Sequence, residues 1–462
     1  MRTARPALER AAAHALAYLE DAAEAPVARG VSTPELAASL GGALPEAPTD
    51  PVAVIDDLAA AAAPGLVRTN AGRYFGFVEG GTLPAALAAD WLTSVWDQNP
   101  AFDVLSPAAA AAEEAVAGWL RELLGLPARV SVGLTTGAQM ANVAGLAAAR
   151  DRVLAEAGWD VEADGLVGAP EVTVVAGAER HATIGRALRL LGLGERRVVE
   201  VPADARGRMA PAALARALGA GPTIVCAQAG NVNTGACDPL AAVTDLAGEH
   251  GAWVHVDGAF GLWAAASPRH RELVAGAERA DSWAVDGHKW LNVPYDCGIV
   301  ACAHAESHRR AMALSAAYLA RSGGRDGSDW SPESSRRARV FTVWAALRSL
   351  GREGVADLVD RCCAYARRIA TALEAEPGVR VLNDVVLNQV LVSVGDEVRT
   401  REVAAAIQAE GVVWLGTTVW QGTPALRISV SDHATGESEV EAVVAAIRRA
   451  LRPRRRFSGS RG

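Results

Sequence analysis

The sequence predicts an α/β protein, with a mostly parallel sheet covered by helices and a small C-terminal α+β domain. Between about Ser131 and Ala303, short runs rich in β-branched residues alternate with helical stretches rich in alanine and leucine, as in such sheets. A segment rich in Gly, Ser and Asp, from Ser322 to Ser335, follows this region. The chain has 462 residues, 50% of them hydrophobic, which is more than one core usually holds.

The expected elements are taken in chain order. Five regions are expected: an N-terminal helical arm (1–70), a large domain (71–310), a mobile active-site loop region (311–340), a small C-terminal domain (341–452) and a disordered basic tail (453–462). The strand candidates of the large domain are Val172 to Ala176, Thr223 to Ala229, Trp253 to Asp257, Ser282 to Asp286 and Gly298 to Ala303. The helix candidates are Ala141 to Ala157, Ala182 to Leu191, Pro211 to Leu218, Pro239 to His250, Val340 to Leu350 and Val355 to Leu373.

Composition and charge narrow the class of protein. A net charge of −8 disfavours nucleic acid and anionic membranes as partners, in spite of the basic residues near the C-terminus. Apolar runs such as Leu58 to Ala63 are too short to span a membrane, and no continuous apolar signal region follows Met1, so a cytoplasmic location is expected. The six cysteines show no CxxC spacing, which predicts reduced core thiols and no metal site.

The chain contains a single lysine, Lys289, within the segment Asp286 to Trp290. A lysine amine can lose its proton when desolvated and form an imine with an aldehyde, whereas a guanidinium stays charged. In a chain so rich in alanine and arginine, one remaining lysine is also what chance composition allows. The neighbouring motifs favour the chemical interpretation, because Asp257 and Lys289 both fall at or just after predicted strand ends, where such sheets bind ligands.

Several spaced motifs follow one another along the chain: Thr136 to Asn142, His181, His255 to Ala259, Asp286 to Leu291 and Tyr295 to Gly298. Together they resemble the group II pyridoxal-phosphate-dependent amino acid decarboxylases. The resemblance extends from about Tyr74 to Ile447, and agreement among several motifs is more specific than one His-Lys pair. It implies the aspartate aminotransferase fold (fold type I), a homodimer and one pyridoxal 5'-phosphate per active site.

Three residues receive catalytic roles. Lys289 would hold the cofactor through a carbon–nitrogen double bond and carry a proton once released by substrate. Asp257 would pair with the pyridine nitrogen and keep it protonated, which makes the ring an electron sink; an aspartate before glycine is otherwise a turn residue or a helix cap. The resemblance places His181 against one face of the ring, although alone it reads as an ordinary residue at a helix start.

The phosphate group is expected at the turn that contains Gly137, Ala138 and Gln139. This turn leads into a helix, whose free N–H groups and dipole favour a dianion. Gln139 stands where relatives usually carry Thr or Ser, so contact through the backbone is expected. His288 would contribute beside Lys289 or pack behind it, and Asp286 stands where relatives often have Asn. A carboxylate near phosphate is unfavourable unless it is turned away or paired.

The remaining contacts follow from the resemblance. Ala259 would contact the cofactor ring, and Asn231 would bind near the hydroxyl side of the ring, although turn chemistry is the usual role in such a loop. Arg427 matches an arginine that binds substrate carboxylate through its guanidinium fork. Tyr74 and Phe75 match a segment that lines the substrate pocket in relatives, although aromatic residues at this density are more often core.

Decarboxylation of an L-amino acid to the amine and carbon dioxide is the expected reaction. One feature departs from the family: Gly327 stands where aromatic amino acid decarboxylases carry the loop tyrosine that returns a proton, and no tyrosine lies between Tyr318 and Tyr365. Either His181 or Lys289 returns the proton, or the enzyme is an aminotransferase or an aldehyde-forming relative. A cofactor-dependent binding or regulatory protein is the alternative of another class. Four tryptophans, which could form an apolar pocket or pack in the core, weakly favour aromatic substrates: Trp91, Trp96, Trp414 and Trp420.

Overall fold

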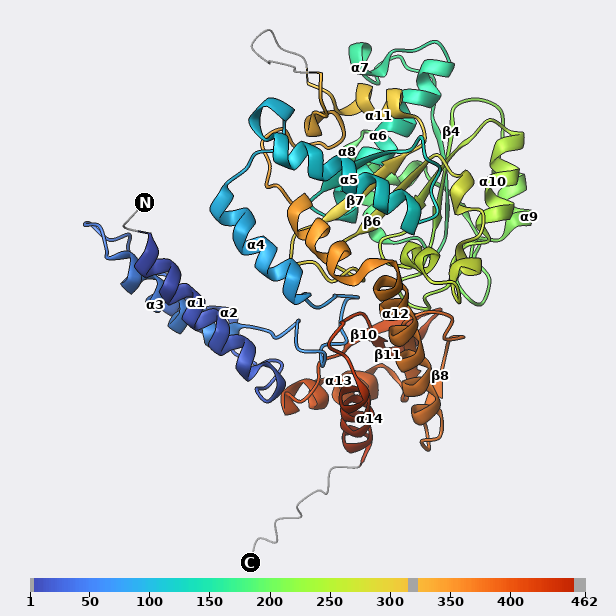
Figure 1. Cartoon of the computed structure of the whole chain (residues 1–462). Helices are drawn as coiled ribbons and strands as arrows, with labels where there is room; N and C mark the ends of the chain where they lie inside the picture. Colours follow the sequence, from blue (N-terminus) through green and yellow to red (C-terminus); the bar gives the residue numbers. More distant parts are fainter. Residues whose placement is uncertain (1–3, 315–322, 453–462) are drawn as a thin grey trace, which may run out of the picture.

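A seven-stranded mixed sheet forms the centre of the large domain in the computed structural model, which describes residues 4–314 and 323–452 (Figure 1). The strand order is β1-β7-β6-β5-β4-β2-β3. Strands β2 to β6 pair in parallel, and β7 runs antiparallel to both β1 and β6, so the prediction of a mostly parallel sheet is confirmed. The strands are β1 Ser131–Thr135, β2 Thr173–Gly177, β3 Val199–Val201, β4 Thr223–Gln228, β5 Trp253–Asp257, β6 Ser282–Asp286 and β7 Gly298–Cys302.

Helices cover both faces of this sheet (Figure 1). Along β2 and β4, Val174 and Ile224 pack with α6 and α8, whereas Val175 and Val225 pack into the main core on the other face. Successive strand side chains point to opposite faces, so strands covered on both sides read as continuous apolar runs. The helices of this part are α4 Pro84–Trp96, α5 Pro107–Leu123, α6 Ala138–Glu156, α7 Val161–Asp164, α8 Ala182–Leu190, α9 Pro211–Ala217, α10 Leu240–Glu249 and α11 Ala305–Met312.

The small domain is a four-stranded antiparallel sheet with helices against it. The long helix α12, Val340–Glu374, connects it to the large domain and joins the two helices predicted here. Gly351 lies between them at φ 62°, a backbone conformation that glycine adopts without strain, and kinks the helix. The other elements are β8 Arg380–Val381, β9 Gln389–Ser393, α13 Glu397–Glu410, β10 Gly416–Trp420, β11 Thr423–Ser429 and α14 Glu437–Leu451.

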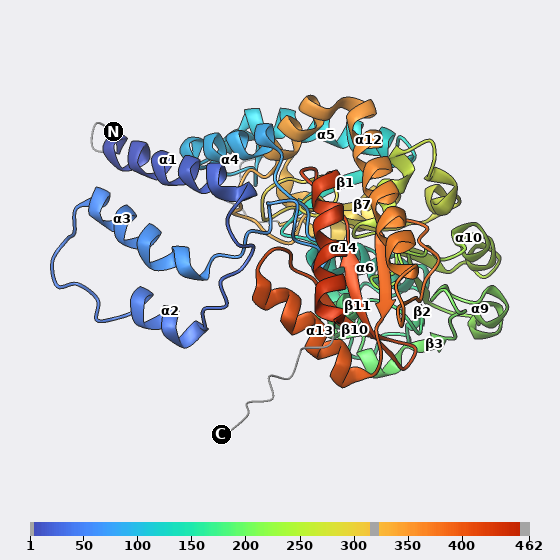
Figure 2. The same ribbon diagram turned by 90° about the horizontal axis from the view of Figure 1, so that it is seen from below.

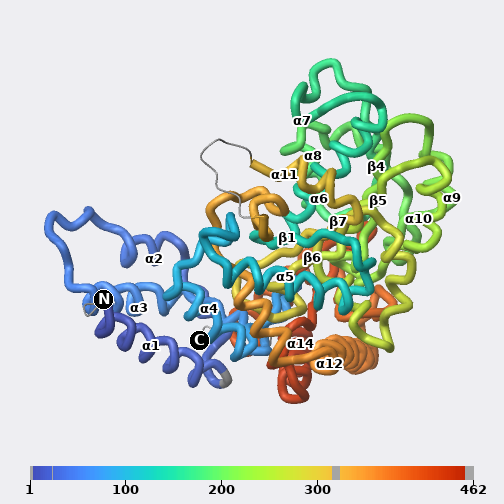
Figure 3. Tube along the Cα trace, turned by 45° about the horizontal axis from the view of Figure 1, so that its top comes forward, coloured from blue at the N-terminus to red at the C-terminus, as the bar shows by residue number. Residues whose placement is uncertain are grey.

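The N-terminal arm stands away from the body of the molecule (Figures 2 and 3). Its helices α1 Arg5–Glu20, α2 Thr33–Leu40 and α3 Pro51–Ala62 contain no buried residue, although each is amphipathic. The buried Val27 fixes the arm to the small domain, because its N–H donates to the carbonyl of Gly411 at 2.8 Å. Amphipathic helices whose apolar side chains are not buried in their own chain need another surface to cover those side chains. Within residues 4–314 and 323–452, no helix is long and apolar enough to cross a membrane.

The segment predicted as a mobile loop packs on its own chain where the structure describes it. Ser322 lies outside the described residues, as does the tail 453–462. Residues 327–329 form a buried 3₁₀ turn, and the N–H of Ser328 donates to the carbonyl of Ala101 at 3.0 Å. A Cβ at Gly327 would lie 2.1 Å from a guanidinium nitrogen of Arg336, so a larger residue would have to displace that buried side chain. The predicted loop mobility is not tested by these contacts.

Candidate active site

The carboxyl ends of β5 and β6 meet the start of helix α6, and Lys289 lies at this junction. Its Nζ is 2.9 Å from Oδ2 of Asp286, the last residue of β6. The lysine side chain is 21% exposed, whereas that of Asp286 is 4% exposed. The amine is therefore accessible to a small molecule and is held by a carboxylate behind it.

The start of α6 forms a cradle for an anion. Oδ1 of Asp286 accepts a hydrogen bond of 2.6 Å from the N–H of Ala138, the first residue of this 19-residue helix. Gly137 precedes it, and a Cβ there would lie 3.1 Å from Cε1 of His288. Gly298 approaches so closely from β7 that its Cβ would lie 2.3 Å from the carbonyl carbon of Gly137. Backbone N–H groups at a helix start favour negative charge, and here a carboxylate already takes this place.

His288 is part of the same cluster. Its Nδ1 accepts a hydrogen bond of 3.1 Å from the N–H of Cys297, and its Nε2 lies 3.3 Å from Oδ1 of Asp286. The ring lies 4.4 Å from that of Tyr295. Burial lowers the pKa of His288, while the charge of Asp286 opposes this shift. Because Nδ1 accepts from Cys297, the neutral tautomer carries its proton on Nε2, on the side of Asp286.

Asp257 ends β5 and is held by three donors. Its Oδ1 accepts from the N–H of Ala259 at 3.2 Å. Its Oδ2 accepts from Nδ2 of Asn142 and from the hydroxyl of Thr183, each at 3.3 Å. These contacts fix the orientation of the carboxylate at the sheet edge.

A chain of buried hydrogen bonds supports this carboxylate from behind. The indole N–H of Trp253 donates to the Ser282 hydroxyl at 2.9 Å, and that hydroxyl lies 2.8 Å from Nδ1 of His255. Nε2 of His255 lies 2.9 Å from Oδ1 of Asn142, whose amide nitrogen reaches Asp257. The only consistent assignment puts the imidazole proton on Nε2, so every donor in the chain points towards Asp257. The sequence analysis did not assign a role to this network.

This network predicts a dependence of stability on pH. Burial lowers the pKa of His255 from 6.5 to about 4, while the charge of Asp257 opposes the shift. Between these values the unfolded chain binds the extra proton, so stability is present above pH 6.5 and is lost as the pH falls towards 4. His255→Gln should therefore reduce the slope of the unfolding free energy against pH by about 1.4 kcal/mol per pH unit. Urea unfolding between pH 4.5 and 6.5 measures this slope, with the exposed His250→Gln as control; parallel lines for wild type and His255→Gln would contradict it.

His181 lies beside Thr183, whose hydroxyl also contacts Asp257. It is the residue before α8, and its Nδ1 accepts from the N–H of Thr183 at 3.3 Å. Burial lowers the pKa of His181; the charge of Asp257 opposes this shift, and those of Lys289 and Arg427 add to it.

Arg427 and Asn231 differ in how far their polar atoms are already engaged. Arg427, on β11, has one hydrogen bond of 3.4 Å to the carbonyl of Val232 and no anionic partner among the described residues. Burial lowers its pKa. Asn231 has no exposed surface, donates to the carbonyl of Glu179 at 3.0 Å, and accepts from the N–H groups of residues 233 and 234. Arg427 is therefore free to bind an anion, whereas Asn231 is engaged in its turn.

The backbone of Gly80, which follows the aromatic residues 74, 75 and 77, lies against the backbone of Lys289. A Cβ at Gly80 would lie 1.8 Å from the carbonyl oxygen of Lys289, so only glycine permits this approach. Tyr74 and Phe77 stack on Trp414 at 4.9 and 5.4 Å. Phe77 is 60% exposed.

Two predicted contacts adopt other positions in this structure. Phe75 has no exposed surface and belongs to the main core, which is the more common role of an aromatic residue. The side-chain amide of Gln139 donates to the carbonyl of Thr183 at 3.3 Å, so only the backbone N–H of this residue is available for an anion at the start of α6. Both stay predictions as binding residues.

These features together fit pyridoxal 5'-phosphate. The accessible amine matches the aldehyde of the cofactor, and the buried acid at the neighbouring strand end matches its ring nitrogen. The N–H groups at the start of α6 match its phosphate. The arginine without an anionic partner matches the carboxylate of an amino acid. This combination on a mostly parallel sheet with a small second domain defines a cofactor-dependent enzyme of fold type I.

Comparison with known proteins gives the family. Residues 34–394 match the pyridoxal-dependent decarboxylase conserved domain, and the chain belongs to this family. The acidic amino acid decarboxylase GADL1 of Bos taurus is 30% identical over 332 residues, covering 68% of this chain and 62% of that protein. The phenylacetaldehyde synthase of Arabidopsis thaliana is 26% identical, over 92% of this chain and 91% of its own.

The fold agrees with that of solved structures. The crystal structure of Oryza sativa TDC with PLP and tryptamine superposes with a TM-score of 0.91, covering 98% of each chain at 24% identity. This is a likeness of fold. The chain spans less than two thirds of the length of the GADL1 relatives, so the activity of those proteins is not assigned to it.

Proposed function

We propose that this chain catalyses the pyridoxal-phosphate-dependent decarboxylation of an L-amino acid to the amine and carbon dioxide. The observation that carries the proposal is the sole lysine, held as an ion pair at the end of β6 within a cluster that also contains Asp257 and His181. Membership of the pyridoxal-dependent decarboxylase family supports the same reaction. A cytoplasmic location is part of the proposal.

The cofactor, when bound, supplies a cationic ring that accepts the electron pair left at Cα after carbon dioxide departs. Asp257, oriented by its three donors, would hold the proton on the ring nitrogen. The ring of His181 would fix the plane of the cofactor, so that the bond to be broken stands perpendicular to it. Lys289 would hold the aldehyde carbon and, once released, carry a proton.

Substrate recognition would rest on Arg427. A half-buried guanidinium without an anionic partner can bind a carboxylate through two parallel hydrogen bonds. Phe77 and Tyr74, which stack on Trp414, would offer an apolar surface to the side chain of the substrate. This favours an aromatic substrate over an acidic one.

An aldehyde-forming reaction is the second candidate. No tyrosine occurs between Tyr318 and Tyr365, and Gly327 is buried beneath Arg336. The similarity to a phenylacetaldehyde synthase covers nearly the whole chain. Without a phenolic proton donor, the electron pair at Cα would be open to dioxygen from solution as a two-electron oxidant, and aldehyde, ammonia and hydrogen peroxide would form beside carbon dioxide.

A panel of amino acids tests both candidates and separates them from transamination and from binding without turnover. Carbon dioxide with an equal amount of amine is expected. Carbon dioxide with aldehyde in place of amine would select the second candidate. Keto acid without carbon dioxide would reject both, and no product from any amino acid would favour a binding protein.

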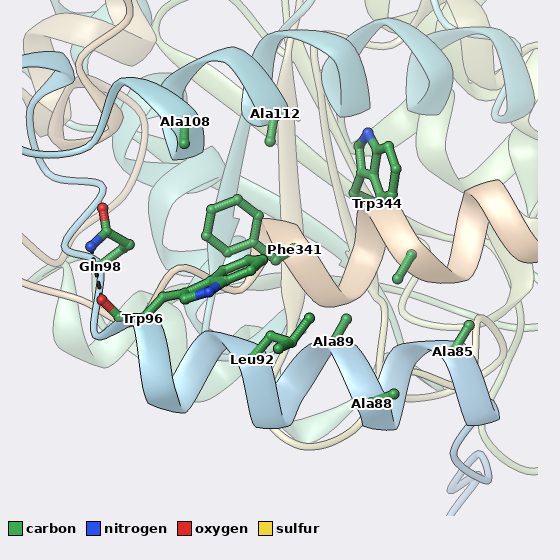
Figure 4. Close-up of a pocket in the computed structure, with 11 residues that line it drawn as sticks. Ala85, Ala88, Ala89, Leu92, Trp96, Gln98, Ala108, Ala112, Phe341 and Trp344 are labelled. Atoms are coloured by element: carbon green, nitrogen blue, oxygen red, sulfur yellow. Dashed lines mark hydrogen bonds between the residues drawn. The ribbon is translucent and has the colours of Figure 1, made fainter. Parts of the chain in front are cut away.

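We also propose that two copies form a homodimer through the apolar groove between α4, α5 and α12 (Figure 4). The groove encloses about 710 Å³, and Leu92, Trp96, Phe341 and Trp344 point into it from facing helices. Trp96 meets Phe341 edge-on at 5.1 Å, yet Trp96 and Trp344 are exposed. Exposed apolar surface of this kind usually marks an interface, and the arm helices offer further uncovered apolar side chains.

Trp344→Asp should therefore convert the protein from a dimer to a monomer of 47.8 kDa. A carboxylate in the centre of an apolar interface is desolvated without a partner, which costs several kcal/mol. Light scattering measures the mass, and Leu190→Asp, at an exposed site on α8, is the matched control. A wild-type protein that is monomeric and fully active would contradict the dimer.

A further inference from the structure

The carboxylate of Asp286 occupies the place that the cradle offers to an anion. It accepts from the N–H of Ala138 at 2.6 Å, lies 2.9 Å from Nζ of Lys289, and lies 3.3 Å from Nε2 of His288. Three donors of three kinds thus converge on one buried carboxylate. No other acid is within ion-pair distance of Lys289 among the described residues.

The backbone of Asp286 is fixed, so only its side chain can give way. Its N–H donates to the carbonyl of Ala259 at 2.8 Å, and its own carbonyl accepts from the indole of Trp263 at 3.0 Å. Its side chain fills the space that glycine leaves open at position 137, where a Cβ would lie 3.4 Å from Oδ1. A phosphate group brought to the start of α6 would meet this carboxylate at close range, and two anions at such a distance repel each other.

The same carboxylate is the nearest base to the lysine. An ammonium cannot attack an aldehyde, because its nitrogen has no free electron pair; it must first lose a proton. Oδ2 of Asp286 lies 2.9 Å from the nitrogen that carries that proton. A carboxyl group that has accepted the proton is neutral and no longer repels a phosphate.

We propose that Asp286 is the base that loads the cofactor and the internal anion that phosphate must displace. The inference rests on the proposed function. A proton passes from Nζ of Lys289 to Oδ2 of Asp286, the amine nitrogen forms a bond to the aldehyde carbon, and the carbonyl oxygen leaves as water after taking up two protons. One of these comes from the nitrogen and the other from solvent, so Asp286 keeps the proton that it received. The neutral form of Asp286 lets phosphate take its place at Ala138, so binding of the two ends of the cofactor is coupled.

The variant Asp286→Asn separates the two roles, because they predict effects of opposite sign. The amide keeps an acceptor for Ala138 but has neither the charge nor the basicity. Inorganic phosphate should bind the cofactor-free variant roughly tenfold more tightly than wild type, since the like charge is gone. Covalent loading with pyridoxal 5'-phosphate, followed by visible absorbance, should become about a hundredfold slower.

The experiment uses the full-length protein with the cofactor removed, and Asp245→Asn is the control for loss of one surface charge. Equilibrium dialysis measures phosphate binding, and stopped-flow absorbance measures loading; Asp286→Ser repeats both if the Asn variant does not fold. Equal phosphate affinity in wild type and variant would overturn the inference, and so would an unchanged loading rate. If wild type gains no visible absorbance with the cofactor and borohydride attaches none, the proposed function fails, while the phosphate comparison still tests the displaced anion.

Discussion

Replacement of Lys289 by arginine should abolish covalent attachment of pyridoxal 5'-phosphate and lower kcat by about four orders of magnitude or more. The guanidinium keeps the positive charge beside Asp286, so the ion pair at 2.9 Å in the wild type has a substitute. It remains protonated and cannot form a carbon–nitrogen double bond with an aldehyde. The variant thus removes the reactive amine while it keeps the electrostatics of the cluster.

The unique lysine makes the measurement unusually direct. Borohydride reduction of the loaded wild type should add one cofactor mass to the peptide that contains Lys289, and the only other primary amine of the chain is its N-terminus. The arginine variant should gain no mass at this peptide and no visible absorbance. Arg186→Lys, which adds an amine on α8, controls for unspecific labelling. Retained turnover in Lys289→Arg, or attachment of the cofactor at the N-terminus alone, would contradict the assignment.

The central strands were predictable because each is buried along its length. The bounds expected for β5 and β6 agree with the structure, since apolar runs there end at an aspartate and a turn follows. The strand candidates omitted β3, Val199–Val201, because three residues at a sheet edge show no period. They also omitted β1, Ser131–Thr135, at the other edge of the sheet. The prediction treated the arm only as helical, because apolar residues that contact a partner look the same in sequence as those that contact the chain's own core.

The candidate site residues could be predicted from short sequence motifs, whereas contacts between residues far apart in the sequence could not. Asp257, His288 and Lys289 lie in short motifs at strand ends, and the fold brings these ends together. The contact of Asn142 with Asp257 joins residues 115 positions apart, and that of Ala138 with Asp286 joins residues 148 positions apart. Nothing in local pattern indicates such pairs.

Asp286 shows how sequence and structure together define the role of a residue. The sequence indicates that a carboxylate beside the phosphate position must be paired or turned away. The structure shows that it is paired, and with which groups. Tyr295 shows the reverse case: it lies within a quoted motif, but only its contact of 4.4 Å with the His288 ring reveals that it borders the site.

Replacement of Asp257 by asparagine should lower kcat by about a thousandfold, which corresponds to roughly 4 kcal/mol of transition-state stabilisation. The amide is close in shape, but it has one acceptor oxygen, so it can accept either from Ala259 or from Asn142 and Thr183. It carries no charge, so it cannot keep a proton on the ring nitrogen. The electron pair left at Cα then meets a neutral ring, which is a poor acceptor.

Because Lys289 is intact in this variant, the cofactor should still attach and borohydride should still trap it. The loss should therefore appear in kcat of the loaded enzyme, measured as carbon dioxide release, while the attached cofactor per chain stays close to that of wild type. Asp245→Asn, which removes a surface carboxylate, controls for net charge. If Asp257→Asn kept its wild-type kcat, the acid would have only a structural role and the proton on the ring would need another source. If the variant failed to attach the cofactor, Asp257 would act in binding before it acts in catalysis.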